Sequence, residues 1–289
     1  MTTASSQVQT HTKHLSLVFA MLTLFISPFS LAQNRIISAG YGVTEIIYAL
    51  EAQEQLVAAD YTSRSFIEGT NISQVGIHVR LSAEGLLAQE PTQLIGTNEM
   101  GPPSVIDKVK QSGVNVNIVS SEQSVKGLID RIHQIGSITQ NEEKANLLAT
   151  AVEQDVQTMN DSICQQKPNV VFFMLDRSSN IRVGGKNTAI DSVISLSGAS
   201  NPASDLIQGY KAMNTEAMFA LQPDYILISQ RAWDMYGSKE KILNALPLLK
   251  STNAGNEGNI VVISSGALLG GFGLSSIELA KKLHQTYCQ

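Results

Sequence analysis

The chain has 289 residues, of which 43% are hydrophobic and 16% charged, so it can bury a sizeable core and is long enough for two domains. Its formal net charge is -5, and no stretch concentrates Lys or Arg, which argues against a nucleic-acid partner. Two cysteines exclude a disulfide-dense miniprotein and a four-cysteine zinc ribbon, but they allow one bridge in an oxidising compartment.

Residues 1–32 have the pattern of a secretory signal. Lys13 precedes an apolar run from Leu15 to Ile26, and residues 30–32 supply the small-x-small pattern that signal peptidase accepts. The alternative is an uncleaved membrane anchor, but the run is shorter than the ~20 apolar residues that span a bilayer. We therefore expect cleavage after Ala32, which leaves a soluble, acidic, exported protein.

After residue 34, short apolar segments alternate with helical patterns. The expected buried strands are residues 35–38, 56–59, 93–95, 115–119, 170–175, 225–228 and 260–263. Such alternation is typical of parallel α/β units. Between the two halves, residues 141–163 contain no Gly or Pro and place apolar residues at helical spacing, which predicts one long helix.

An internal repeat relates the two halves. Residues 82–95 align without gaps on residues 214–227, so that Glu84 falls on Glu216 and each copy has Pro at the same place. Each copy predicts a short helix, a turn and a buried strand. We therefore expect two similar parallel-sheet α/β lobes joined by one helix. The N-terminal lobe is residues 33–140, the connecting helix residues 141–166 and the C-terminal lobe residues 167–289.

Common catalytic motifs are absent from the sequence. It has no G-x-S-x-G elbow, no P-loop and no H-E-x-x-H, and residues 40–42 lack the third glycine of a dinucleotide fingerprint. His78, His133 and His284 are scattered, which is a poor pattern for a zinc site. We therefore expect a binding protein with no catalytic residues, and an exported enzyme on the same scaffold is the alternative.

A ligand of such lobes is expected in the crevice outside the carboxyl ends of the strands. The loops predicted there carry aromatic, Met and Arg side chains, which suit a flat apolar ligand with carboxylates. The alternative is ordinary loop packing. The candidate ligand-binding residues are His78, Arg80, Tyr41, Tyr61, Met100, Arg177, Tyr236 and Phe272.

Four segments carry a resemblance to a known family. Residues 35–50 hold Arg-Ile-Ile-Ser-Ala-Gly and Val-Thr-Glu-Ile-Ile-Tyr-Ala-Leu, and residues 75–85 read Val-Gly-Ile-His-Val-Arg-Leu-Ser-Ala-Glu-Gly. Residues 99–103 read Glu-Met-Gly-Pro-Pro, and residues 268–273 read Leu-Leu-Gly-Gly-Phe-Gly. Together they resemble the periplasmic haem-binding protein of bacterial ABC haem importers, over essentially the whole mature chain. The first segment is shared with the wider siderophore and cobalamin class, whereas Val-Gly-x-His and Met-Gly-Pro-Pro point to haem.

The resemblance implies a helical-backbone periplasmic binding protein. Such a receptor binds haem, as its transported ligand, between its lobes in the periplasm and delivers it to an inner-membrane ABC permease with its ATPase. We expect it to act as a monomer. A ferric siderophore or a corrinoid is the alternative ligand.

The sequence departs from this family at the expected iron ligand. The family usually has a tyrosine after Val-Gly whose phenolate ligates the iron, and this chain has Ile77 there. The family's Arg is expected two positions later, where this chain has Val79, and Arg80 is the next residue. Ferric haem accepts imidazole or phenolate as an axial ligand. His78, the next residue, is therefore the best candidate, followed by Tyr41, Tyr61 and Tyr236. The alternatives are that His78 turns toward its own lobe as a hydrogen-bonded side chain, or that haem is held without a strong axial bond.

Two further expectations concern the outer surface and the cysteines. In the wider class an acidic residue on each lobe docks onto basic residues of the permease, and the resemblance places Glu84 and Glu216 there. The alternative is a local role in the first turn of each helix. Cys164 and Cys288 lie at the ends of helical patterns that could meet in the second lobe of an exported chain, so we expect a disulfide between them.

Overall fold

The computed structural model describes residues 1–2, 34–162, 167–176 and 181–288. The predicted signal peptide, Cys164 and Arg177 lie outside the described residues. The Cys164–Cys288 bridge and a role for Arg177 therefore remain predictions. Among the helices of the described part, none combines the length and the apolar character that a membrane crossing requires.

The first half of the described chain forms a five-stranded sheet in the order β3-β2-β1-β4-β5, and every pair of neighbours is parallel. Its strands are β1 Ile36–Ala39, β2 Leu56–Asp60, β3 Ser73–Val75, β4 Gln93–Gly96 and β5 Asn115–Ile118. Because all five strands run the same way, the loops that follow them share one edge of the sheet.

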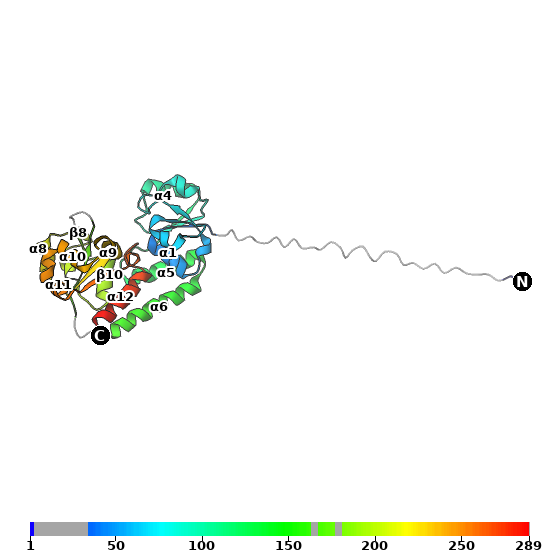
Figure 1. Cartoon of the computed structure of the whole chain (residues 1–289). Helices are drawn as coiled ribbons and strands as arrows, with labels where there is room; N and C mark the ends of the chain where they lie inside the picture. The colour runs from blue at the N-terminus through cyan, green and yellow to red at the C-terminus, as the bar shows by residue number, and fades with distance from the viewer. Residues whose placement is uncertain (3–33, 163–166, 177–180, 289) are drawn as a thin grey trace. The chain divides into compact units, whose positions relative to one another are not determined.

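Five helices accompany this sheet (Figure 1): α1 Tyr41–Ala49, α2 Arg64–Ile67, α3 Ala83–Leu87, α4 Pro103–Gln111 and α5 Val125–Thr139. Helix α1 begins only two residues after the end of β1. Gly40 has φ 120°, a conformation that favours glycine, and this residue turns the chain directly from β1 into α1. Ile46 and Ile47 are then fully buried in the core.

The second half also has five strands, in the order β10-β9-β6-β7-β8. They are β6 Val170–Met174, β7 Arg182–Gly184, β8 Tyr210–Ala212, β9 Tyr225–Ser229 and β10 Ile260–Ile263. β6, β9 and β10 are parallel, but β7 is antiparallel to both β6 and β8. The expectation of a parallel sheet is thus wrong for this edge. The connection from β6 to β7, residues 175–181, is too short for a parallel crossover.

The helices of the second half are α7 Ala189–Leu196, α8 Thr215–Ala220, α9 Gln230–Tyr236, α10 Lys239–Ala245, α11 Asn253–Glu257 and α12 Leu274–Tyr287. The predicted long helix is α6, Glu142–Asp161, which buries Ala145, Val152 and Met159 in the core. It packs against α5 and α12, and Asp155 of α6 pairs with Lys281 of α12 at 3.0 Å.

The internal repeat is present in the structure down to its helix caps. Ser82 accepts a hydrogen bond from the Gly85 amide at 3.0 Å at the start of α3, and Asn214 accepts one from the Ala217 amide at 2.8 Å at the start of α8. After each helix the chain passes through a non-glycine residue of positive φ, Glu90 at 49° or Gln222 at 41°, before entering β4 or β9. The two copies therefore share one local structure.

Glu45 of α1 caps the last helix of the chain. Its carboxylate accepts hydrogen bonds from the Leu274 amide at 2.8 Å, the Ser275 amide at 2.9 Å and the Ser275 hydroxyl. Glu45 is only 8% exposed. Burial raises its pKa, against the opposing effect of the hydrogen bonds from Ser275 and Leu274. A carboxylate at a helix N-terminus satisfies amides that have no partner within the helix.

Two further contacts join α1 and α5 to the segment before α12. The guanidinium of Arg131, which is buried, donates to the carbonyl of Phe272 and to the carbonyl of Ser120. The backbones of Gly42 and Gly270 meet so closely that a Cβ on Gly270 would lie 2.6 Å from the Gly42 nitrogen. Side chains are excluded at that contact.

We expect Glu45→Ala to lower the free energy of unfolding by about 2–4 kcal/mol, because buried amides at the start of α12 lose a charged acceptor. Glu45→Gln should lower it less, since one acceptor oxygen remains. Urea denaturation followed by circular dichroism measures both. Glu84→Ala, which removes an exposed carboxylate from the first turn of α3, is the matched control. An unchanged midpoint for Glu45→Ala would contradict the role of this cap.

Candidate functional site

A buried carboxylate organises the carboxyl edge of the first sheet. Asp60 is the last residue of β2 and is 0% exposed. Its Oδ1 accepts hydrogen bonds from the Gly40 amide at 3.1 Å, the Thr62 hydroxyl at 2.7 Å and the Ser63 hydroxyl at 3.1 Å. Its Oδ2 accepts the His78 amide at 3.0 Å and lies 3.0 Å from His78 Nδ1. One carboxylate thus connects the loops that follow β1, β2 and β3.

The pKa values of Asp60 and His78 shift in opposite directions. Burial alone would raise the pKa of Asp60, but hydrogen bonds from His78 and Thr62 outweigh it and hold the pKa below its ordinary value. The hydrogen bond to Asp60 raises the pKa of His78, against burial, and the charges of Asp60 and Glu99 add to the increase. The pair is therefore an ionised carboxylate bonded to one nitrogen of an imidazole.

The other ring nitrogen of His78 lies near an exposed carboxylate. Nε2 lies 3.8 Å from a carboxylate oxygen of Glu99, whose side chain is 63% exposed, whereas that of His78 is 14% exposed. An exposed glutamate in this position is easily displaced, because water screens its attraction. Nε2 is thus the ring nitrogen available to a ligand.

Exposed apolar and cationic side chains lie on the His78 turn and on the loop that follows β2. Ile77 and Val79 are 38% and 52% exposed on a tight turn that the Arg80 amide closes by donating to the Ile77 carbonyl at 2.7 Å. Tyr61 is 47% exposed, and the guanidinium of Arg64 donates to its hydroxyl and lies 4.9 Å from its ring centroid. Arg80 is exposed as well.

Tyr41 contacts both α2 and the segment that follows β10. Its ring packs on Phe66 with centroids 5.0 Å apart, and its hydroxyl lies against Gly266, where a Cβ would clash with it. Burial raises the pKa of the Tyr41 phenol, against the effect of a hydrogen bond with Ser275. Iron ligation by tyrosine uses the phenolate, so this environment makes Tyr41 a poorer ligand than His78.

The remaining candidates occupy different surroundings. Met100 is 6% exposed and Phe272 is 0% exposed, and both pack in hydrophobic cores. Neither the Met100 nor the Phe272 side chain is therefore accessible to a ligand in this structure. Tyr236 ends α9 and packs partly buried against the core of the second sheet. The structure thus gathers Tyr61 and His78 at one sheet edge, with Arg80 on the same turn as His78.

Sequence reasoning did not single out Asp60 or Glu99 as residues of the site. A signal for Asp60 existed, because an acidic residue directly after the apolar run 56–59 stands at the carboxyl end of a predicted buried strand. Nothing in the sequence alone distinguishes Glu99 from other exposed glutamates.

The two glutamates of the repeat are both accessible. Glu84 lies in the first turn of α3 and Glu216 in the first turn of α8, and both are exposed. Neither is part of an ion pair with another residue in the described part of the chain.

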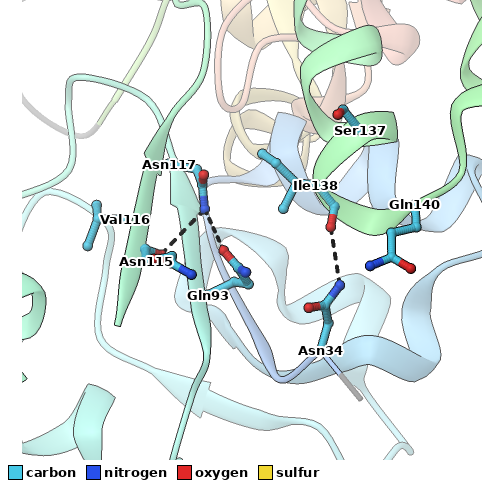
Figure 2. Close-up of a pocket in the computed structure, with 8 residues that line it drawn as sticks. All are labelled: Asn34, Gln93, Asn115, Val116, Asn117, Ser137, Ile138 and Gln140. Atoms are coloured by element: carbon cyan, nitrogen blue, oxygen red, sulfur yellow. Dashed lines mark hydrogen bonds between the residues drawn. The ribbon is translucent and has the colours of Figure 1, made fainter. Parts of the chain in front are cut away.

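A polar pocket lies at the opposite edge of the first sheet, by the first residues of β4 and β5 (Figure 2). It has a volume of about 400 Å³ and is lined by Asn34, Gln93, Asn115, Val116, Asn117, Ser137, Ile138 and Gln140. Asn117 Nδ2 donates to Gln93 Oε1 at 2.9 Å, and Asn34 Nδ2 donates to the Ile138 carbonyl at 3.2 Å. With neither aromatic nor charged lining residues, this pocket does not match a planar anionic ligand, so the Asp60–His78 edge is the better candidate.

The first sheet is parallel and its candidate site lies at the carboxyl ends of the strands, where open α/β sheets bind their ligands. Residues 36–267 match the family described as periplasmic binding protein, and the chain belongs to that family. Its structure is similar to that of the periplasmic heme-binding protein HutB of Vibrio cholerae, with a TM-score of 0.83 and 41% identity over 88% of this chain and 99% of that one.

Two curated relatives are more distant. An uncharacterized ABC transporter substrate-binding lipoprotein of Bacillus subtilis (strain 168), YvrC, is 26% identical over 67% of this chain, which spans 63% of that relative's length. The vitamin B12-binding protein of Pectobacterium atrosepticum is 23% identical over 77% of this chain and 78% of its own.

We expect the Asp60–His78 pair to make stability depend on pH. Because the folded-state pKa of His78 is raised, its contribution is fully present below about 6.5 and is lost as pH rises through the folded value. The lowered pKa of Asp60 gives a contribution that is present above about 3.9 and is lost as pH falls through its folded value. Urea denaturation at a series of pH values measures the free energy of unfolding.

The wild-type protein should lose stability relative to His78→Gln, which lacks the titrating ring, as pH rises from about 6.5 through the raised pKa of His78. His133→Gln, which changes an exposed histidine of α5, serves as the control and should follow the wild type. Parallel curves for the wild type and His78→Gln would show that the pair does not stabilise the fold.

Proposed function

We propose that this protein is the haem receptor of an ABC importer. It is exported, loses residues 1–32, binds haem as a monomer in the periplasm, and passes it unchanged to the inner-membrane permease and its ATPase. The observation that carries the proposal is the His78 imidazole, whose Nδ1 bonds to buried Asp60 while Nε2 lies 3.8 Å from the exposed carboxylate of Glu99. Neutral imidazole presented in this way is a good axial ligand for haem iron.

The residues beside His78 fit the other parts of haem. Exposed Ile77, Val79 and Tyr61 offer apolar surface to the macrocycle. The exposed guanidinium of Arg80 and that of Arg64 match carboxylates in a two-point geometry and would hold the propionates. Tyr236, Tyr41 and Arg177 complete the proposed contacts, and the similarity to HutB, described as a heme-binding protein, supports the same ligand.

A corrinoid is the second candidate, because a relative described as a vitamin B12-binding protein shares 23% identity over most of this chain. The carboxamide groups of a corrinoid side chain are neutral, whereas haem propionates are anionic. The two cations near His78 therefore favour haem.

We expect the exported protein to bind one hemin per chain, with a saturable change in the Soret absorbance during titration at micromolar concentration. Cyanocobalamin and a ferric siderophore, added in excess, should not displace hemin, since neither matches an axial imidazole flanked by propionate-binding cations. Calorimetry with each compound provides an independent measure. Tight binding of cyanocobalamin with no saturable hemin spectrum would replace haem by a corrinoid as the ligand.

His78→Ala should shift the Soret maximum and weaken hemin binding by ~1 kcal/mol or more, the scale of a lost interaction with a desolvated partner. His133→Ala is the matched control, since it removes an exposed imidazole from α5 and should retain the wild-type spectrum. A wild-type spectrum and affinity in His78→Ala would transfer the iron ligand to a tyrosine.

We also propose that Glu84 and Glu216 dock the receptor onto its permease. Their exposure and equivalent places in the repeat support this role, and carboxylates on a rim chiefly set encounter rate and orientation. The double exchange to Ala should leave hemin affinity unchanged and should reduce receptor-stimulated ATP hydrolysis by the reconstituted permease more than either single exchange. Unchanged stimulation, or loss of hemin binding, would contradict docking.

A further inference from the structure

The ring of His78 is held more firmly than an axial ligand alone would need. Its backbone amide and its Nδ1 both meet the same oxygen of Asp60, each at 3.0 Å. The other oxygen is fixed by the Gly40 amide and by the hydroxyls of Thr62 and Ser63. The carboxylate therefore cannot turn away from the ring without breaking bonds to three loops.

This arrangement selects one tautomer of the imidazole. An ionised carboxylate can only accept hydrogen bonds, so the ring nitrogen that faces Asp60 has to carry a proton. In the neutral ring the second nitrogen, Nε2, is then unprotonated and is directed toward Glu99. The neutral ring therefore needs no change of tautomer before Nε2 binds iron.

The charge of Asp60 also acts on whatever Nε2 binds. Asp60 is 0% exposed, so water screens its field only weakly, whereas the side chain of Glu99 is 63% exposed. A carboxylate that accepts the second ring N–H raises the basicity of a metal-bound histidine. A more basic ligand and a nearby negative charge stabilise the iron centre that carries the larger positive charge, which is the ferric one.

We propose that Asp60 is a positioning residue that fixes His78 in its Nδ1–H tautomer and makes the site hold ferric haem more tightly than ferrous haem. Only the second part of this inference, the preference for ferric haem, rests on the proposed function. The tautomer is a property of the protein without ligand.

The first test is made on the ligand-free protein. A long-range ¹H–¹⁵N correlation spectrum, recorded at a pH above the raised pKa of His78, distinguishes the two neutral tautomers. We expect the Nδ1–H pattern for His78, identified by its loss in His78→Gln. An Nε2–H pattern, or rapid exchange between both, would overturn the proposal whether or not haem binds.

The second test measures oxidation-state preference with hemin and its dithionite-reduced form. Asp60→Asn should lower the ratio of ferric to ferrous affinity about tenfold, the lower end of losses on removing a hydrogen-bonding partner of a metal ligand. For a one-electron couple this corresponds to a rise of about 59 mV in reduction potential. Asp224→Asn, which removes a half-buried carboxylate next to β9, is the control and should keep the wild-type potential.

The outcomes separate the two proposals. Absence of hemin binding to the wild type would defeat the haem assignment and leave the tautomer spectrum to decide the role of Asp60. Hemin binding with the same potential in Asp60→Asn as in the wild type would defeat the oxidation-state preference alone. If Asp60→Asn does not fold, the wild-type spectrum still supports or overturns the positioning role.

Discussion

The carboxylate of Glu45 connects the first helix of the described chain to the last one, and much of the architecture depends on it. It accepts hydrogen bonds from two amides at the start of α12 that have no partner within the helix. The Glu45 side chain is almost inaccessible to water. Arg131 adds a buried contact to the same segment through the Phe272 carbonyl. Moving α12 away from α1 would leave buried charged groups without partners, which costs several kcal/mol for each.

This constraint bears directly on the site. Tyr41 begins α1, four residues before Glu45, and its hydroxyl lies against Gly266 in the segment after β10. The close contact of Gly42 and Gly270 fixes the same two segments at backbone level. The loops at the carboxyl ends of β1 and β10 are therefore held together before a ligand arrives, and binding requires little rearrangement of this part of the protein.

The sequence pattern predicted those parts of the fold whose burial follows from a local run of apolar residues. The seven expected strands are present because each is a short run of apolar residues between turns, and the repeat is present because its capping residues and prolines fall in register. β3, β7 and β8 were not expected. They have three residues each and include polar ones such as Gln74 and Lys211, so pairing with neighbours, and not hydrophobicity, defines them.

The site was less predictable, because it depends on contacts between residues of different loops. His78 could be singled out from its residue type, but the role of Asp60 exists only once three loops converge on one carboxylate. Met100 illustrates the opposite error. A loop residue next to a strand can turn inward, and Gly96 has no Cβ in the space that the Met100 sulfur fills, so this side chain belongs to the core.

The departure at position 77 has a consistent electrostatic explanation. A tyrosine there would give ferric iron a phenolate, which is an anionic ligand, and Ile77 gives it none. If His78 binds haem as proposed, its neutral imidazole would bring the negative charge of Asp60 close to the iron, because Nδ1 of the ring is hydrogen-bonded to that buried carboxylate. His78 and Asp60 together would thus supply the same net charge as a single phenolate. In the proposed complex, the acid at the end of β2 is what would let the iron ligand move by one residue along the Gly76–Arg80 turn without loss of negative charge.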